Sequence, residues 1–511
     1  MTMLTEAVNQ ASTVVKNAVE ETRAQADVEE ISTVTGISGC TAEVDGLKSV
    51  QMEELLTFSG NVSGMAFTLS EDNVGVVFLD EPKGVKAGDR VQRTNRVVDV
   101  PVGEALLGRV IDPLGKPLDG KGAIETTERM PVEREAFPIM SRAPVSVPLQ
   151  TGIKAIDSFT PIGRGQRELI LGDRQTGKTA LAVDTIINQK NTGVISIYCS
   201  IAQRGTAIAR VVDNLQKYGV LQNTVVVAAS ADETAGMQYI APYAATAIGE
   251  YFMQKGKDVL IIYDDLTGHA RAYREVSLLL RRPPGREAFP GDIFYIHSRL
   301  LERATHLRDE FGGGSLTAFP IVETEAQNMS AYIPTNIISI TDGQIYLSSP
   351  MFQKGILPAI DTGRSVSRVG GDAQLPAYSK LVGPLKLSFS QFEELESFAK
   401  FRSSLDKETE RQLKRGRAIR SVMQQKQFVP MPVEEQVAVL TATTEGLLDD
   451  VAEGKIFEAC DVICDVIRNE RRDVAEKILN REKLDDAIKS GLLDSFKEAL
   501  ERSGLVFEKR D

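Results

Sequence analysis

One eight-residue segment limits the possible folds of this chain more than any other part of the sequence. It has the sequence GDRQTGKT and lies between the apolar run Leu169–Leu171 and the helical pattern of residues 180–187. A strand, a glycine-rich loop and a helix in this order are typical of a phosphate-binding loop, whose backbone N–H groups surround the phosphates. The residues of the loop are Gly172, Asp173, Arg174, Gln175, Thr176, Gly177, Lys178 and Thr179.

Two side chains of this loop predict the ligand. Lys178 is placed to reach the β- and γ-phosphate oxygens, and the Thr179 hydroxyl is placed to ligate Mg²⁺. The alternative is a chance glycine-rich turn, but the full pattern and both flanking elements are present. We therefore expect a domain that binds ATP or ADP together with Mg²⁺.

The composition limits the architecture and the partners. A chain of 511 residues is too long for one hydrophobic core, so about three domains are expected. The net charge of −12 argues against nucleic acid or an anionic membrane as a partner. No apolar run approaches the roughly 20 residues of a membrane span, and the N-terminus carries no pattern of a secretory signal. Four cysteines in the chain fit a reducing compartment.

Changes of pattern divide the chain into four segments and predict a multidomain α/β protein. Residues 1–27 have the spacing of an amphipathic helix, which either frays or docks onto a partner. Residues 28–98 contain six short β-rich runs between turn residues, which predict a small closed β-barrel. Residues 99–376 alternate strands and helices, which predicts a parallel sheet with helices on both faces. Residues 377–511 carry helical patterns alone and predict a helical domain.

Five apolar runs of the central segment are strand candidates, and one of them ends in acid. In P-loop enzymes the carboxylate at the end of a neighbouring strand holds Mg²⁺, directly or through water. We assign this role to Asp264, although a turn or capping aspartate is the alternative. The candidates are Glu168–Leu171, Val194–Ser200, Thr224–Ala229, Val259–Tyr263 and Ile337–Ile340.

The strand after the loop's helix ends near Gln203, where a hydrolytic enzyme would need a group that activates water. A carboxylate often takes this role, and an amide cannot accept the proton. Some GTPases orient water with glutamine, and a plain loop residue is a further alternative. Gln203 therefore weakens the case for ATP turnover without excluding it.

Several longer strings resemble the α-subunit family of F-type rotary ATP synthases. The resemblance runs from about Ile31 to the C-terminal helices. The family's fold is a six-stranded barrel, a RecA-like nucleotide-binding domain and a helical bundle, which matches the segments above. The strings are Gly172–Thr179, Tyr263–Leu266, Leu278–Asp292, Ala331–Gln344, Ser365–Gly370 and Pro432–Val439.

This resemblance implies a complex that couples ion flow across a membrane to ATP synthesis or hydrolysis. The α subunits alternate with β subunits in a ring of six around a central shaft, γ, and contact a peripheral stalk that includes δ. The chain would be a peripheral protein on the cytoplasmic, matrix or stromal side of the membrane. The β subunit has a catalytic Glu where α has Gln, and Gln203 matches the α pattern.

The resemblance also implies roles for individual residues. Arg368 would reach the catalytic site of the adjoining β subunit as an arginine finger, whereas the sequence alone favours a surface arginine. Gln425 and Gln427 match contacts on the adenine side of the non-catalytic nucleotide, and an exposed polar loop is the alternative. Phe352 lines the same pocket or simply packs.

The sequence departs from the family's pattern at two places. Leu357 stands where the family commonly has Arg, and residues 202–206 differ from the usual GQKRST, which leaves open a divergent second copy of α.

Two other functions are alternatives to this prediction. A homohexameric secretion ATPase would have a carboxylate at the position of Gln203. An RNA translocase like the transcription terminator Rho would have an aromatic and basic barrel surface, which residues 28–98 lack.

Overall fold

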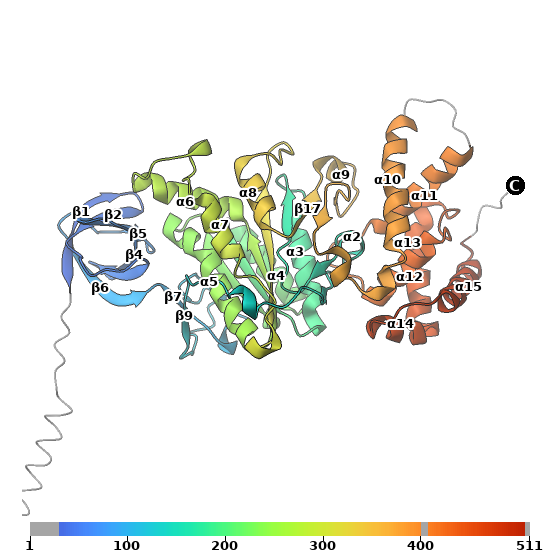
Figure 1. The fold of residues 1–511 in the computed structure, drawn as a ribbon, viewed down its shortest axis with the longest axis horizontal. Coiled ribbons are helices and arrows are strands. Elements are labelled where there is room, and N and C mark those ends of the chain that lie inside the picture. The colour runs from blue at the N-terminus through green and yellow to red at the C-terminus, as the bar shows by residue number, and fades with distance from the viewer. Residues whose placement is uncertain (1–29, 400–406, 506–511) are drawn as a thin grey trace, which may run out of the picture.

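Three parts follow one another along the molecule, which a computed structural model describes over residues 30–399 and 407–505. Figure 1 shows a β-barrel at one end, an α/β domain in the middle and a group of helices at the other end. This arrangement confirms the fold class predicted from the sequence. The predicted helix over residues 1–27 lies outside the described residues and stays a prediction.

The barrel is closed because β1 pairs antiparallel with both β2 and β6, in the strand order β1-β2-β5-β4-β3-β6. Inside it, the rings of Phe58 and Phe78 pack with centroids 4.9 Å apart. Gly64 makes room for them, since a Cβ at this position would lie 2.7 Å from the Phe58 ring. The strands are β1 (Ile31–Ser38), β2 (Thr41–Asp45), β3 (Glu54–Phe58), β4 (Val62–Leu69), β5 (Asn73–Phe78) and β6 (Arg90–Val97).

An eight-stranded sheet forms the centre of the molecule, in the order β18-β17-β12-β16-β15-β13-β14-β8. Its strands are parallel except for β18, which runs antiparallel to β17. They are β8 (Val110–Ile111), β12 (Leu169–Gly172), β13 (Ile195–Gln203), β14 (Thr224–Ser230), β15 (Asp258–Asp264), β16 (Ser315–Glu323), β17 (Gly343–Leu347) and β18 (Val366–Ser367). Two short ribbons flank the sheet: β7 (Asp99–Pro101) with β9 (Arg129–Pro131), and β10 (Pro148–Leu149) with β11 (Ile162–Gly163).

Helices cover both faces of this sheet, so its strands are apolar on both sides. In β15, Leu260 and Ile262 pack with α3 and α4, whereas Val259 and Ile261 pack with α5 to α8. The helices are α2 (Lys154–Phe159), α3 (Lys178–Asn188), α4 (Gly205–Lys217), α5 (Ala235–Gln254), α6 (Leu266–Leu279), α7 (Ile293–Leu301), α8 (Tyr332–Ile340) and α9 (Ser349–Gln353).

The list of strand candidates from the sequence analysis needs correction. Ile337–Ile340 is not a strand but the end of helix α8, in which Ile333 and Ile337, four residues apart, are both buried. A short apolar run with β-branched residues does not distinguish a strand from a buried helix. The analysis also missed four strands of the sheet, β8, β16, β17 and β18. Of these, β16 is a central strand whose internal Pro320 is unusual for such a position.

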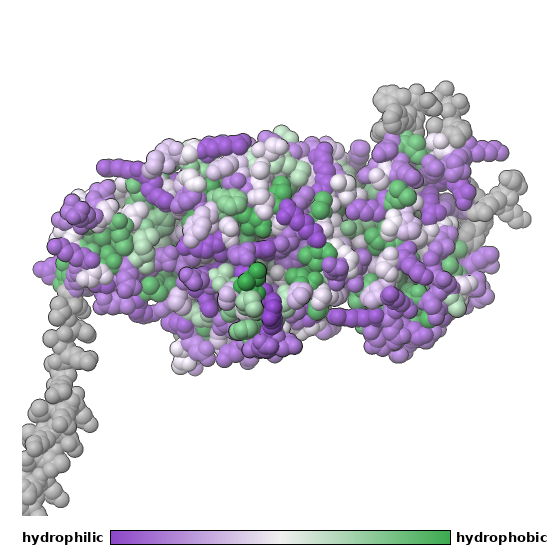
Figure 2. Space-filling model, viewed as in Figure 1, coloured by the Kyte–Doolittle hydropathy of each residue, from purple (hydrophilic) through white to green (hydrophobic). Residues whose placement is uncertain are grey.

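The C-terminal helices share a core with one face of the sheet. The buried residues around α3 and α4 form one cluster with those of the helical part, and the rings of Phe159 and Phe389 stack at 6.3 Å. Figure 2 shows a mostly hydrophilic outer surface at this end. No helix in the described ranges is long and apolar enough to cross a membrane. The helices are α10 (Val382–Ala399), α11 (Lys407–Met423), α12 (Val433–Thr444), α13 (Ile456–Asp465), α14 (Arg472–Leu479) and α15 (Asp486–Arg502).

A completely buried ion pair joins α5 to the segment after α7. Arg303 and Glu250 are both 0% exposed and form a two-bond pair of 2.9 and 2.8 Å. The remaining guanidinium nitrogen of Arg303, Nη1, donates to the Val132 carbonyl at 2.7 Å. Removing one charge of such a pair leaves the other buried without compensation.

We expect Glu250→Gln to destabilise the central domain by about 3–5 kcal/mol, because the charge of Arg303 stays buried. Thermal and urea unfolding of the full chain would measure the loss. The control is Glu470→Gln, which breaks a surface pair with Arg502 and should cost less than about 1 kcal/mol. Equal losses in the two variants would contradict the prediction.

Candidate functional site

The phosphate-binding loop lies between β12 and α3, where the sequence predicted it. Gly172 ends the strand beside the Leu347 carbonyl, and a Cβ at this position would lie 2.8 Å from that oxygen. Gly177 has a φ of 99° just before the helix, a conformation that L side chains rarely adopt. Both glycines are therefore required by the backbone of the loop itself.

Asp173 anchors the loop from its side. Its carboxylate accepts hydrogen bonds from the Thr324 hydroxyl at 2.6 Å, the Ser349 hydroxyl at 2.8 Å and the Gln327 N–H at 2.9 Å. Burial works against the ionised form, but these hydrogen bonds outweigh it and lower the pKa of Asp173. The loop is thus fixed to the ends of β16 and β17.

The Lys178 side chain is held by backbone carbonyls of the phosphate loop. Its ammonium donates to the carbonyls of Gly172 at 2.9 Å and Asp173 at 2.6 Å. Burial lowers the pKa of Lys178, while the carboxylates of Glu323 and Asp265 act in the opposite direction. The lysine charge therefore lies at the loop rather than out in solvent.

The two predicted metal ligands lie in direct contact. The Thr179 hydroxyl donates to Asp264 Oδ2 at 2.7 Å, and the Tyr198 hydroxyl donates to the same oxygen at 2.8 Å. Hydroxyl and carboxylate oxygens are the ligands that Mg²⁺ prefers, so this pair fits the ion. Thr179 and Asp264 would hold it at the phosphates and supply charge neutralisation there.

A second acid lies beside Asp264. Asp265 is 6% exposed, and burial together with the neighbouring Asp264 raises its pKa to about 7. The Gln203 amide lies 3.3 Å from Asp265 Oδ2 and 3.5 Å from Asp264 Oδ1. Gln203 therefore presents its donor end to the acids and offers no group that accepts a proton from water.

Two adjoining cavities meet at the loop. The larger, about 780 Å³, contains the phosphate loop, Gln203 and the acids; the smaller, about 290 Å³, reaches the C-terminal part. Phe352 and Gln427 line both cavities, and Leu357 lines the smaller one. These positions suit a nucleotide whose phosphates lie at the loop and whose base lies beside Phe352.

Gln425 is less available than the sequence suggested. Its amide nitrogen donates to the carbonyls of Gly152 at 2.7 Å and Val429 at 2.8 Å, and its oxygen accepts from the Lys154 N–H. The side chain thus ties the 424–431 loop to α2. A contact between Gln425 and a base stays a prediction.

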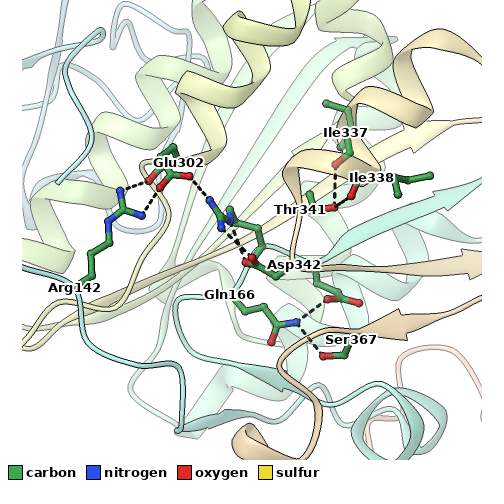
Figure 3. Close-up of polar contacts among 10 residues, drawn as sticks. Arg142, Gln166, Glu302, Ile337, Ile338, Thr341, Asp342 and Ser367 are labelled. Atoms are coloured by element: carbon green, nitrogen blue, oxygen red, sulfur yellow. Dashed lines mark hydrogen bonds and ion pairs between the residues drawn. The ribbon is translucent and has the colours of Figure 1, made fainter. Parts of the chain in front are cut away.

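Arg368 lies apart from both cavities. It follows β18, is exposed, and donates its backbone N–H to the Asp342 carbonyl at 2.8 Å. Asp342 is in turn held by a fork from Arg167, with bonds of 3.0 and 2.9 Å, and Figure 3 shows this acid beside the Gln166–Ser367 contact. The structure therefore does not place Arg368 at the nucleotide site of its own chain.

Several site residues were missed by the sequence analysis. Glu323, at the end of β16, accepts from Arg174 at 3.0 Å and from Arg271 at 3.4 Å and also lines the larger cavity. Tyr198 and Asp265 were missed as well. The signal that could have found Glu323 is its place at the carboxyl end of a strand, but that strand had not been identified.

Comparisons with known protein families give a separate match for each of the three parts of the chain. The ATP synthase alpha/beta family matches with its beta-barrel domain over residues 29–95, its nucleotide-binding domain over 152–367 and its C-terminal domain over 374–499. Three relatives show how far the similarity extends along the chain. "ATP synthase subunit alpha 2" of Syntrophus aciditrophicus is 58% identical over 92% of this chain and 91% of its own. "ATP synthase subunit alpha 1" of Rhodopirellula baltica is 56% identical over 95% and 96%, and that of Chlorobium luteolum 53% over 98% of each.

We expect Tyr198→Phe to weaken the binding of MgADP by roughly tenfold, or about 1.5 kcal/mol, because Asp264 loses a donor that orients it. Isothermal titration with the purified chain would measure this. Tyr263→Phe is the matched control, since its hydroxyl contacts Thr246 rather than the site. Unchanged affinity in Tyr198→Phe, or the same loss in both variants, would contradict the prediction.

Proposed function

Because the chain belongs to the ATP synthase α/β family, as one of its α subunits, we propose that it binds MgATP and turns it over poorly or not at all. The geometry of Gln203 is the main support for this proposal. An amide that donates to Asp264 and Asp265 cannot take a proton from an attacking water. The phosphate loop, Thr179 and Asp264 retain what binding requires.

We also propose that Arg368 acts on the catalytic site of a neighbouring β subunit. Three observations support this role. The side chain is exposed, it lies outside the cavities of its own chain, and among the described residues no carboxylate forms an ion pair with it. A planar guanidinium that is free to reach outward suits the charge of a transferring phosphoryl group.

Membership of the family supports a proposal for the whole assembly. The chain would alternate with β in a hexamer around the γ shaft, contact the peripheral stalk, and work at the surface of an energy-transducing membrane. Ion flow through the membrane rotor would drive ATP synthesis, and ATP hydrolysis would drive ion flow in the opposite direction. The numbered names of the relatives, with Leu357 and the altered 202–206 segment, support a divergent copy of α.

We expect Lys178→Ala to reduce MgATP affinity by about 100-fold, because the phosphates lose a charged donor. Titration of the purified chain measures binding, and a phosphate-release assay measures turnover. Lys190→Ala is the control, since the Lys190 ammonium donates to the Tyr218 carbonyl at 2.9 Å and lines neither cavity. Lys178-dependent turnover by the lone chain would overturn the non-catalytic assignment and favour a homohexameric motor.

We expect Arg368→Lys to lower the ATPase rate of the reassembled complex by about 100-fold, because a point charge does not reproduce the planar fork. Steady-state hydrolysis by complexes with wild-type β would show it. Arg364→Lys is the control, because Arg364 lies over the Tyr346 ring of its own chain. An unchanged rate in Arg368→Lys would remove the arginine-finger role.

A further inference from the structure

Glu168 is a buried acid that the nucleotide site does not use. Its side chain is 0% exposed, at the entrance to β12, on the strand that leads to the phosphate loop. Oε2 accepts a hydrogen bond from the Gln166 amide at 2.7 Å, but Oε1 has no partner among the described residues. A buried polar atom without a partner calls for an explanation, since such groups are rare and unfavourable.

The sheet register points this acid toward Arg368. Leu169 pairs with Gln344, so Glu168 adjoins Gly343 on β17, and Gly343 pairs with Ser367 on β18. Gly343 leaves open the space across which the carboxyl group extends: a Cβ there would lie 2.6 and 2.9 Å from the two carboxyl oxygens. The acid thus reaches across β17 toward β18, the strand that Arg368 directly follows.

A bridging amide completes the connection between the two strands. The Gln166 nitrogen that holds Glu168 also donates to the Ser367 hydroxyl at 3.2 Å, as Figure 3 shows. The Ser367 hydroxyl itself donates to the Pro161 carbonyl at 2.8 Å. Glu168 is therefore fixed beneath the residue that directly precedes Arg368.

The charges around Glu168 are few and known. Burial raises its pKa well above the ordinary value, the nearby Asp342 carboxylate adds to this effect, and Arg368 is the one cation that opposes it. Gln166, which bonds to Glu168, and Ser367, which bonds to Gln166, do not titrate. The approach of the Arg368 guanidinium favours the ionised form of Glu168, and its withdrawal favours the neutral form.

We propose that Glu168 is the counter-ion of a retracted Arg368, a positioning residue that competes with the phosphoryl group in the neighbouring subunit for the same guanidinium. In the retracted state Arg368 donates to Glu168 Oε1, and Glu168 has released its proton to water. When a nucleotide in the β site draws Arg368 outward, Glu168 takes a proton back from water. This inference rests on the proposed role of Arg368.

The competition makes nucleotide binding in the complex sensitive to pH. Each outward movement of Arg368 is coupled to proton uptake by Glu168, so a rise in pH favours the retracted pair. The KM for ATP of the wild-type complex should therefore rise with pH. Glu168→Gln removes the ionisable group and the competing charge, while the retained amide oxygen still accepts from Gln166.

The first experiment compares assembled complexes that carry wild-type α or Glu168→Gln between pH 6 and pH 9. We expect Glu168→Gln to lower the KM for ATP by about fivefold, with a smaller effect on kcat, and to flatten the rise of KM with pH. Glu133→Gln is the matched control, since Glu133 is an acid of low exposure (its side chain is 9% exposed) that has one unpartnered oxygen and lies beside Arg299. A lower kcat and stability with an unchanged pH slope would overturn the proposal in favour of a purely structural role.

A second comparison separates this inference from the proposed function. In an Arg368→Ala background, Glu168→Gln should change neither the KM nor its pH slope. If Arg368→Ala itself leaves the ATPase rate unchanged, the arginine-finger role fails, and the inference fails with it. If Arg368→Ala lowers the rate but Glu168→Gln has the same effect with and without Arg368, the inference alone is wrong.

Discussion

The carboxyl ends of parallel strands meet at one edge of the central sheet, and the whole nucleotide site depends on that meeting. The phosphate loop follows β12, Gln203 ends β13, Asp264 ends β15 and Glu323 ends β16. Segments more than 150 residues apart in the sequence thereby come within hydrogen-bond distance, as Asp173 and Thr324 do. A parallel sheet allows this because every strand delivers its last residue to the same side.

The charges at this edge support the proposal that the chain binds MgATP without efficient turnover. Two buried carboxylates, Asp264 and Asp265, favour a cation, and Lys178 with the backbone of the loop favours phosphate. At the end of β13 this edge carries Gln203, an amide engaged as a donor, rather than a carboxylate. Under the proposed function, a catalytic and a binding subunit would differ at this position by one functional group rather than by architecture.

Most of the fold, but only part of the site, could be predicted from the sequence. The barrel, the loop and the C-terminal helices have strong local patterns, so the type of each of these parts could be predicted. Strand β16 was lost because Pro320 contradicts a central strand, and Ile337–Ile340 was misassigned because its β-branched residues suit either structure. Tyr198 and Glu168 could not be found at all, because their roles arise from pairings between strands that no local pattern encodes.

The shared core between α3, α4 and the C-terminal helices has a mechanical consequence. Apolar side chains from both parts interdigitate in a single cluster, which includes the stacked rings of Phe159 and Phe389. Sliding one part against the other would expose this surface to water, so the two resist shear as one solid piece. We therefore expect a displacement of the C-terminal helices to move α3, the helix that follows the phosphate loop, together with them.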